Sequence, residues 1–382
     1  MAAFAVGLIA VTVTASIFVS RLVAANVSDT VVKDPSTVRL PAPPITPRRP
    51  TAAEVAAMHT LLMATASTPG LAIDRGLATR IVAAVWPVRE QAIDTADIAS
   101  LSTFESGAAL EGDTSLYGTR HCGCPIPAAR SVEWTYVFVP KQATFPASFL
   151  AEVTMASDGG AFAGVALLVF SRASALTPWT VTLATGYSDN SIGPPIVYVG
   201  PVPSGDFNAA LPTSPVDLTA LPGDLASYYE HWATTGTAPL NADFAPGYFT
   251  SYKGGDVYVH GETDGIGGIH HTVYSADPTA DGEWSFAGES FELKPQNGWI
   301  LSCGTVRYES VSTAAVNGPL LNQPPDTSTW GPTLPPGRYS QITQWGLHES
   351  CFAVSPTGAP TLVLGNDGGA TRSTGVLVSV ES

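Results

Sequence analysis

The four cysteines are the residues of this chain with the most distinctive chemistry. Two of them stand one residue apart in the stretch HCGCP at residues 121–125, and the other two are Cys303 and Cys351. A zinc site needs four ligands, whereas this stretch supplies three at most, at a spacing shorter than the usual one. An even cysteine count in an exported chain favours disulfides. We therefore predict covalent cross-links and no metal, with a redox pair and a metal site as the alternatives.

The sequence leaves the pairing of the cysteines open, because four cysteines allow three pairings. Cys303 and Cys351 lie 48 residues apart in strand-like segments of the same half, so a bond between them is the local choice. Closing that loop would stabilise the fold by about 3 to 4.5 kcal/mol. Cys122 and Cys124 would then pair in a small ring, and cross-pairing between the two halves of the chain stays an alternative.

His270 and His271 are the adjacent histidines of the chain. On a strand they must face opposite sides, so at most one can enter a pocket with Ile269 and Val273. A general acid or base also needs a carboxylate to orient its ring. The carboxylates nearby in sequence are Glu262, Asp264 and Asp277. We name His270 and His271 as candidate binding residues, expect one on the surface and one satisfied internally, and name no catalytic residue.

Other polar stretches are predicted to be structural. Residues 277–283 (DPTADGE) and 365–375 (GNDGGATRSTG) are predicted as loops, because the first lacks a full calcium-ligand spacing and no helix follows the second. Asp94, Asp97 and Glu105 could line the mouth of a cone, but a solvated helix end is the simpler prediction. Common hydrolase and nucleotide-binding motifs do not occur, which disfavours those chemistries.

The composition is poor in charge and strongly acidic. Charged residues make up 13% and hydrophobic residues 45% of the 382 residues, with 36 Gly and 32 Pro. Residues 1–50 carry five basic and two acidic side chains, so the remainder has a formal net charge of −18, against −15 for the whole chain. Such a body repels phosphate backbones and anionic headgroups. This disfavours binding to nucleic acid and flat contact with a membrane.

The N-terminal region predicts a membrane anchor. Residues 2–20 are nineteen residues without a charge, enough to span a hydrocarbon core of about 30 Å at about 1.5 Å per residue. We predict a transmembrane anchor or uncleaved signal over residues 1–25. A cleaved signal peptide is the alternative, because Val23-Ala24-Ala25 could serve as a cleavage site. Residues 26–50 are proline-rich and predict a semi-extended linker that holds the body outside the membrane.

Hydrophobic periodicity predicts an α+β fold. Helices are expected from Thr51, whose capping box ends at Glu54, and over residues 74–95. A four-stranded meander follows at residues 134–140, 149–156, 165–172 and 179–187. A similar order then recurs, with a helix at 218–235 and strands at 256–262, 269–276, 283–295, 299–310, 337–345 and 351–356.

We therefore predict two domains, each of helices packed on a curved antiparallel sheet. The first covers residues 51–187 and the second residues 217–382, with a linker at 188–216. The repeated order of elements is consistent with a duplicated domain.

Several packing motifs resemble those of a known family. They are the aromatic-proline strand at 138–140, the turn FPASFLA at 145–151, LVFSR at 168–172 and Pro178-Trp179. In these the chain resembles an actinobacterial family of membrane-anchored or lipoprotein envelope proteins that carry a domain of unknown function. The layout is also similar to the nuclear-transport-factor-like cone fold, in which a curved sheet cups helices. That resemblance implies a fold and does not assign a function.

The expected function is that of a membrane-anchored extracytoplasmic protein without catalytic activity or cofactor. It would bind a small apolar ligand or a partner protein of the cell envelope. One alternative is a cone-fold enzyme that performs acid/base chemistry in an apolar pocket, with His270 or His271 as its base. Another is a structural subunit of a cell-envelope complex, with exposed aromatic side chains as the contact.

Overall fold

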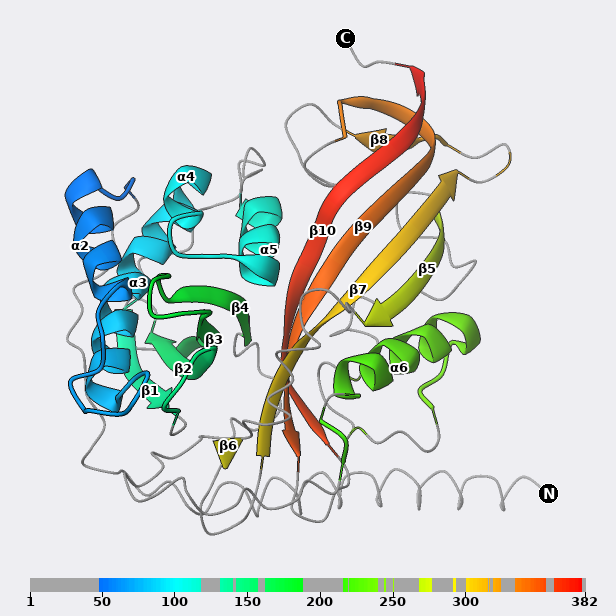
Figure 1. Ribbon diagram of the computed structural model, residues 1–382. Coiled ribbons are helices and arrows are strands. Elements are labelled where there is room, and N and C mark those ends of the chain that lie inside the picture. Colours follow the sequence, from blue (N-terminus) through cyan, green and yellow to red (C-terminus); the bar gives the residue numbers. More distant parts are fainter. Residues whose placement is uncertain are drawn as a thin grey trace.

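The structure is a computed structural model in which helices and antiparallel sheets are combined (Figure 1). It describes residues 48–117, 131–139, 142–156, 162–187, 216–218, 220–239, 244, 250, 268–276, 291–292, 300–314, 316, 319–323, 334–354 and 361–379. The predicted anchor and most of the linker after it lie outside these residues, as do Cys122 and Cys124. Within the described residues, no helix is long and apolar enough to cross a membrane.

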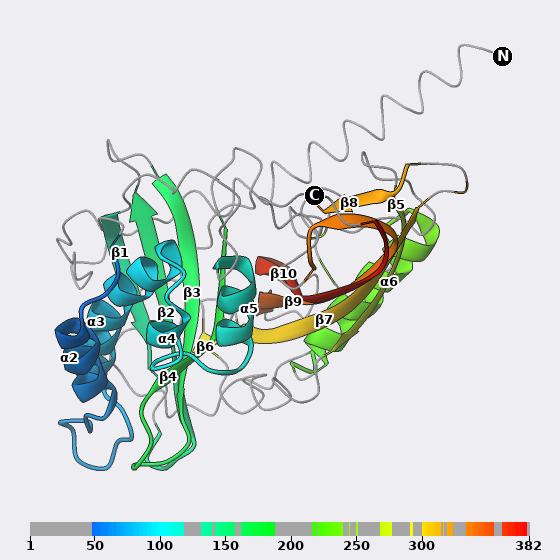
Figure 2. The same cartoon turned by 90° about the horizontal axis from the view of Figure 1, so that it is seen from above.

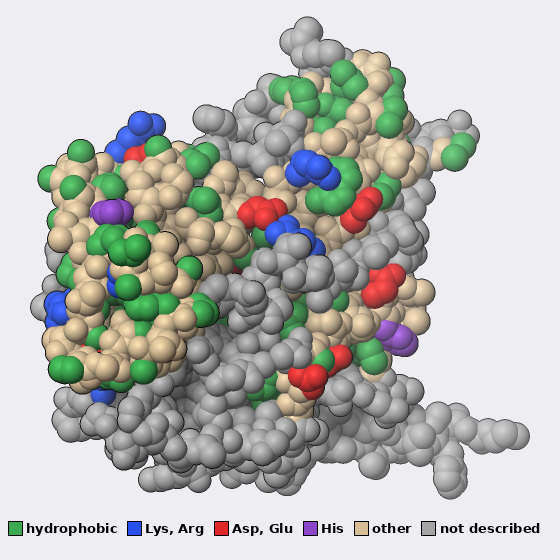
Figure 3. Space-filling model, viewed as in Figure 1, with side chains coloured by type: hydrophobic (Ala, Val, Ile, Leu, Met, Phe, Trp, Pro, Cys, Tyr) green, Lys and Arg blue, Asp and Glu red, His purple; other side chains and the backbone are tan. Residues whose placement is uncertain are grey.

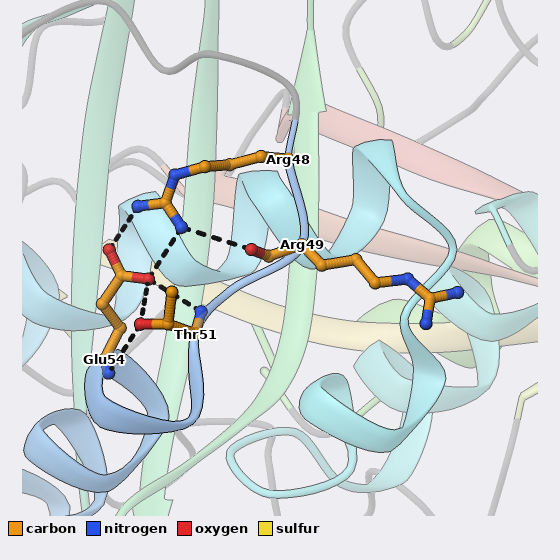
Figure 4. Close-up of polar contacts among 4 residues, drawn as sticks. All are labelled: Arg48, Arg49, Thr51 and Glu54. Carbon is orange, nitrogen blue, oxygen red and sulfur yellow. Dashed lines mark hydrogen bonds and ion pairs between the residues drawn. The ribbon is translucent and has the colours of Figure 1, made fainter.

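The first described helix begins as its sequence predicts. Helix α2 (Ala52–Leu62) has Thr51 as N-cap, and the side chains of Thr51 and Glu54 form the predicted capping box. Arg48 adds an ion pair to the same glutamate, with its Nη1 2.9 Å from Glu54 Oε2 (Figure 4). These hydrogen bonds, first of all that from Arg48, lower the pKa of Glu54 to about 2. The start of α2 is therefore fixed by local side chains alone.

Helix α3 (Arg75–Asp94) is the central helix of the first half. The Asp74 carboxylate caps it by accepting from Leu77 N at 2.8 Å, and the helix continues through Pro87. Its apolar residues, among them Ile81, Val85 and Trp86, are buried against the first sheet. Two shorter helices follow, α4 (Ile98–Leu101) and α5 (Gly107–Tyr117). Sequence periodicity did not predict either of these.

The first sheet is an antiparallel meander in the order β1-β2-β3-β4, as predicted. Its strands are β1 (Ser131–Phe138), β2 (Ala147–Ala156), β3 (Phe162–Arg172) and β4 (Thr180–Tyr187). Phe149 of β2 stacks on Phe170 of β3 at 4.6 Å and meets Trp179 edge-on at 5.3 Å. These rings join the helical side chains in one core, so this face of the sheet carries the packing of the first half.

Arg172 ties the β3–β4 turn to the end of α2. Its side chain is buried, and its guanidinium donates hydrogen bonds to five backbone carbonyls of the described residues. The acceptors are the carbonyl oxygens of Met63, Ala64, Ser174, Ala175 and Thr177. One buried guanidinium thus joins carbonyl groups at a helix end and a turn, so the Leu-Val-Phe-Ser-Arg motif has a structural role.

The second sheet follows helix α6 (Leu221–Thr235), which ends at Gly236 in the left-handed conformation. Its main strands run in the order β10-β9-β7-β5, with β6 and β8 paired to β7 and β9. The strand bounds are β5 (Gly268–Ala276), β6 (Phe291–Glu292), β7 (Ile300–Ala314), β8 (Leu321–Gln323), β9 (Gly337–Val354) and β10 (Leu362–Ser379). Helix α6 packs on one face through a core that includes Leu221, Leu225, Val306 and Phe352.

Two predictions for the second sheet are wrong in detail. The strands predicted at 337–345 and 351–356 are a single strand, β9, because the polar residues between them continue its pairing with β7 and β10. The glycine-rich stretch 365–375, predicted as a loop, lies inside β10. At Gly375 an added Cβ would lie 2.4 Å from the ring of Tyr339 on β9, so glycine there makes room for a cross-strand aromatic ring.

Helix α5 lies between the two sheets, and β4 is the edge strand of the first sheet that meets the second. Both pack against β10 and β9, and the view from above shows α5 standing between the first sheet and the β9–β10 pair (Figure 2). The free edge of β4 is partly paired by the α4–α5 connection. Val181 N donates to Phe104 O at 2.8 Å, and Ser106 N donates to Val181 O at 2.9 Å. Covering an edge strand in this way removes a site for unwanted strand pairing.

Candidate functional site

Helix α5 contributes three consecutive residues to contacts with three other elements. Asp113 forms an ion pair with Arg89 of α3, and Glu111 forms one with Arg307 of β7. Between them, Gly112 faces the carboxylate of Glu349 on β9. We call these residues together with Glu105 and Glu90 the α5 junction. It is the densest group of charged side chains within the described residues, so it is the candidate functional site.

Arg89 is the centre of the buried part of the α5 junction. Its Nε lies 2.7 Å from Glu105 Oε1, and its Nη2 bonds the Asp113 carboxylate. Glu90 is further away, with its Oε1 3.9 Å from Arg89 Nη1. The residues Arg89, Glu90, Glu105 and Asp113 are 7%, 8%, 2% and 5% exposed. One guanidinium therefore serves several buried carboxyl groups.

Glu105 is the member of this group that departs most from its ordinary ionisation. Burial and then the neighbouring charge of Asp113 raise its pKa well above the usual range, which the Arg89 charge offsets only in part. Its Oε2 is buried and accepts no hydrogen bond from an N–H or hydroxyl group of the described residues. The sequence predicted a solvated helix end at Glu105, and this prediction is wrong, because the connection after α4 turns back onto β4 and takes the side chain inside.

The outer part of the α5 junction links α5 and β4 to the second sheet. Glu111 and Arg307 form a two-pronged ion pair, with oxygen–nitrogen distances of 2.9 and 2.7 Å. Glu349 Oε1 accepts a hydrogen bond from the backbone amide of Ala184 in β4 at 2.8 Å. An added Cβ at Gly112 would lie 3.2 Å from Glu349 Oε2. The close approach of α5 to β9 thus depends on the absence of a Cβ atom at Gly112.

The sequence-predicted site residues lie elsewhere. Strand β5 confirms the predicted strand at the two histidines, and its register pairs His270 with Ser312 and His271 with Val311. Their candidate role in binding stays a prediction. Their neighbours Glu262, Asp264 and Asp277, and the predicted loop at 277–283, lie outside the described residues. Asp97 caps α4 by accepting from Ser100 N at 3.3 Å.

The disulfide prediction is confirmed for one pair. Cys303 of β7 and Cys351 of β9 stand directly opposite each other and are bonded. Both residues are fully buried, on the strands that also carry Arg307 and Glu349. The bond therefore lies in the sheet face that the α5 junction contacts. Across the residues that the structure describes, no three histidine, cysteine or acidic side chains are placed to hold a metal ion.

Known proteins offer no guide to this site. Comparison with protein families, with curated proteins and with solved structures finds no match. The resemblance to actinobacterial envelope proteins and to cone folds therefore stays a prediction. What the site can do has to be argued from its own geometry.

Two further buried ionisable groups escaped the sequence analysis. Glu152 of β2 is 2% exposed, and burial raises its pKa to about 8. It lies on a face of the first sheet that also carries Leu150, Leu167 and Val169, all of them buried. His348 of β9 packs against the rings of Tyr229 and Tyr308, and burial lowers its pKa to about 4. The Leu-His-Glu-Ser-Cys run inside a strand was the available signal.

Proposed function

We propose that the protein is a membrane-anchored extracytoplasmic module that binds a partner protein of the cell envelope through the end of β10. In this proposal residues 1–25 are the single-pass anchor and 26–50 the spacer. The body consists of two α+β units that share an order of elements, and it has no catalytic role. The observation that carries the proposal is a run of exposed apolar side chains on an edge strand.

That run is Val376, Leu377 and Val378, which are 55%, 46% and 55% exposed. Every residue from Thr374 to Ser379 is exposed, on the last strand of the second sheet. Hydrophobic side chains gather at this end of the molecule in the space-filling view (Figure 3). Three consecutive half-exposed apolar residues on a strand expose both of its faces, as expected of a contact surface that awaits a partner.

The charge of the body favours a protein over a lipid surface as that partner. The chain beyond residue 50 has a formal net charge of −18. Anionic headgroups would repel such a body, and only an apolar contact of small extent is offered to the hydrocarbon. A protein with an exposed apolar surface meets neither obstacle.

The compartment is supported by the Cys303–Cys351 disulfide. Buried disulfides persist in oxidising spaces and are rare in a reducing cytosol. A non-catalytic role is supported by the α5 junction, whose charged groups are engaged with one another. Arg89 bonds Glu105 and Asp113, Arg307 bonds Glu111, and Glu349 bonds a backbone amide.

Photo-crosslinking in the native membrane tests this proposal. A photoreactive amino acid is placed at Leu377 of the full chain, and a matched probe is placed at Leu176, which is 87% exposed on the β3–β4 turn. We expect a discrete protein adduct from position 377 that is absent from position 176. The adduct should disappear when Val378→Lys is added. Equal adducts from both positions, or none from 377, would overturn the proposal.

A further inference from the structure

The connection between α4 and α5 is held by its backbone pairing with β4, by the buried ring of Phe104, by a hydrogen bond from Ser106 Oγ to Thr180 Oγ1 at 3.0 Å, and by one charged side chain. Its backbone pairs with the edge of β4 through the hydrogen bonds of Phe104 and Ser106 with Val181. The charged side chain is that of Glu105, whose Oε1 lies 2.7 Å from Arg89 Nε. Gly107, with φ of 60°, then turns the chain into α5. The position of α5 therefore depends on whether Glu105 stays inside.

The charges around Glu105 make its buried position sensitive to a proton. From α3 it bonds Arg89, whose guanidinium also lies 3.9 Å from Glu90, and from α5 it meets the charge of Asp113. Within the described residues, other charged groups packed against α5 are Glu349 of β9, bonded to the Ala184 amide, and Arg307 of β7, bonded to Glu111. Arg89 is thus the cation for two directly bonded carboxyl groups. If both are ionised, this buried pair of acids exceeds the charge of Arg89 by one.

We propose that Glu105 is a proton-controlled contact that couples the two sheets. With its carboxyl protonated, the α4–α5 connection stays paired to β4, and α5 stays seated against the second sheet. Ionisation leaves an unbalanced negative charge beside Asp113, and the connection separates from the edge of β4. Because α5 carries Glu111 and Gly112, that separation loosens its contacts with β7 and β9 as well.

The sign of the effect follows from the ionisation of Glu105. Its pKa is raised in the closed form by burial and by the charge of Asp113. A carboxyl that binds its proton more tightly when closed favours the closed form at low pH. Opening should become about tenfold easier for each pH unit above the ordinary glutamate pKa of about 4.3, until the raised pKa is reached. Acid therefore closes the contact and alkali opens it.

Hydrogen–deuterium exchange of the full-length protein tests the proposal from about pH 5 to about pH 9, with rates corrected for intrinsic exchange. We expect protection of residues 104–107 and of the β4 amides at 181–184 to fall as pH rises. Glu105→Gln should remove the fall, because the side chain can no longer ionise. Glu152→Gln is the matched control. It removes another buried carboxyl, one in the middle of the first sheet, so it should lessen only the exchange that passes through unfolding of the whole chain and should leave the local fall at residues 104–107 unchanged.

Asp113→Asn is the second variant and serves if Glu105→Gln does not fold. A single Glu105 carboxylate is neutralised by Arg89, so this change should also flatten the pH dependence. Circular dichroism at each pH distinguishes local opening from unfolding of the whole chain. Protection that is flat in the wild type would overturn the proposal. A fall in protection with rising pH that persists in both Glu105→Gln and Asp113→Asn would also overturn the proposal.

Discussion

Glu349 of the second sheet accepts a hydrogen bond from the backbone amide of Ala184 in the first, with Oε1 2.8 Å from the nitrogen. A carboxylate from one sheet thus satisfies an edge amide of the other. Both residues are buried, so loss of the contact would leave the Ala184 N–H group without this acceptor inside the protein. The packing of the two sheets depends on this bond and on the residue that faces it, Gly112.

Gly112→Ala is expected to destabilise the protein even though alanine is the better helix former. The gain in helix propensity is about 1 kcal/mol. The new Cβ, however, would meet Glu349 Oε2 at 3.2 Å, and that carboxylate cannot retreat without weakening its bond to Ala184. A hydrogen bond to a charged group contributes about 1.5 to 3 kcal/mol, so the net loss is about 1 kcal/mol.

Urea unfolding of the wild type, Gly112→Ala and Gly76→Ala measures the free energy of unfolding of each. The control is Gly76→Ala, in the first turn of α3. There the nearest atom to a new Cβ is 3.4 Å away, so the substitution should be neutral or stabilising. If Gly112→Ala were as stable as Gly76→Ala, the close approach of α5 to β9 would be wrong.

Glu152→Gln should make the protein less sensitive to alkali. Burial raises the pKa of Glu152 to about 8, so the folded state binds a proton that the unfolded state releases above about pH 4.3. The free energy of unfolding therefore falls as pH rises from about 4.3, the unfolded pKa, to about 8, the folded pKa. Between about pH 5 and about pH 7 the fall is about 3 kcal/mol. The variant should lose this share of the decline in the free energy of unfolding. Glu309→Gln, at an exposed position on β7, is the control and should leave the full decline in the free energy of unfolding unchanged.

His348→Phe should reduce sensitivity to acid. Burial between the rings of Tyr229 and Tyr308 lowers the pKa of His348 to about 4, so the folded state excludes a proton that the unfolded state binds. The penalty is absent above about pH 6.5 and grows as pH falls, reaching about 2 kcal/mol at about pH 5. Phenylalanine keeps an aromatic ring at the site and cannot titrate. Thermal unfolding measured at several pH values checks this. If the melting temperature of His348→Phe fell with acid as steeply as that of the wild type, the assignment would be contradicted.

Local signals predicted much of the fold. Thr51 and Glu54 mark the start of α2, and alternation around Phe149 and Trp179 marks the first sheet, because these patterns act over a few residues. An expected oxidising compartment and strand-like flanks were enough to suggest the bond between Cys303 and Cys351. These features are fixed by near neighbours or by covalent chemistry.

The α5 junction could not be predicted in the same way. Gly107 and Gly112 weaken the helical pattern of α5, and the reason for Gly112 lies on β9, more than two hundred residues away in sequence. Arg89 and Glu105 read as surface residues until the turn after α4 brings them together. The glycines of β10 suggested a loop, because the strand that pairs with them is a long-range partner. Tertiary contacts overrode local propensity at each of these places.

The proposed location of this body, an oxidising space outside the membrane, requires that Cys303 be bonded to Cys351 in the cell. Peptide mapping without reduction tests it most directly, on protein from intact cells alkylated before lysis. We expect to recover a linked pair of peptides that contain Cys303 and Cys351, with neither cysteine alkylated. Recovery of both cysteines as separate alkylated peptides would contradict it.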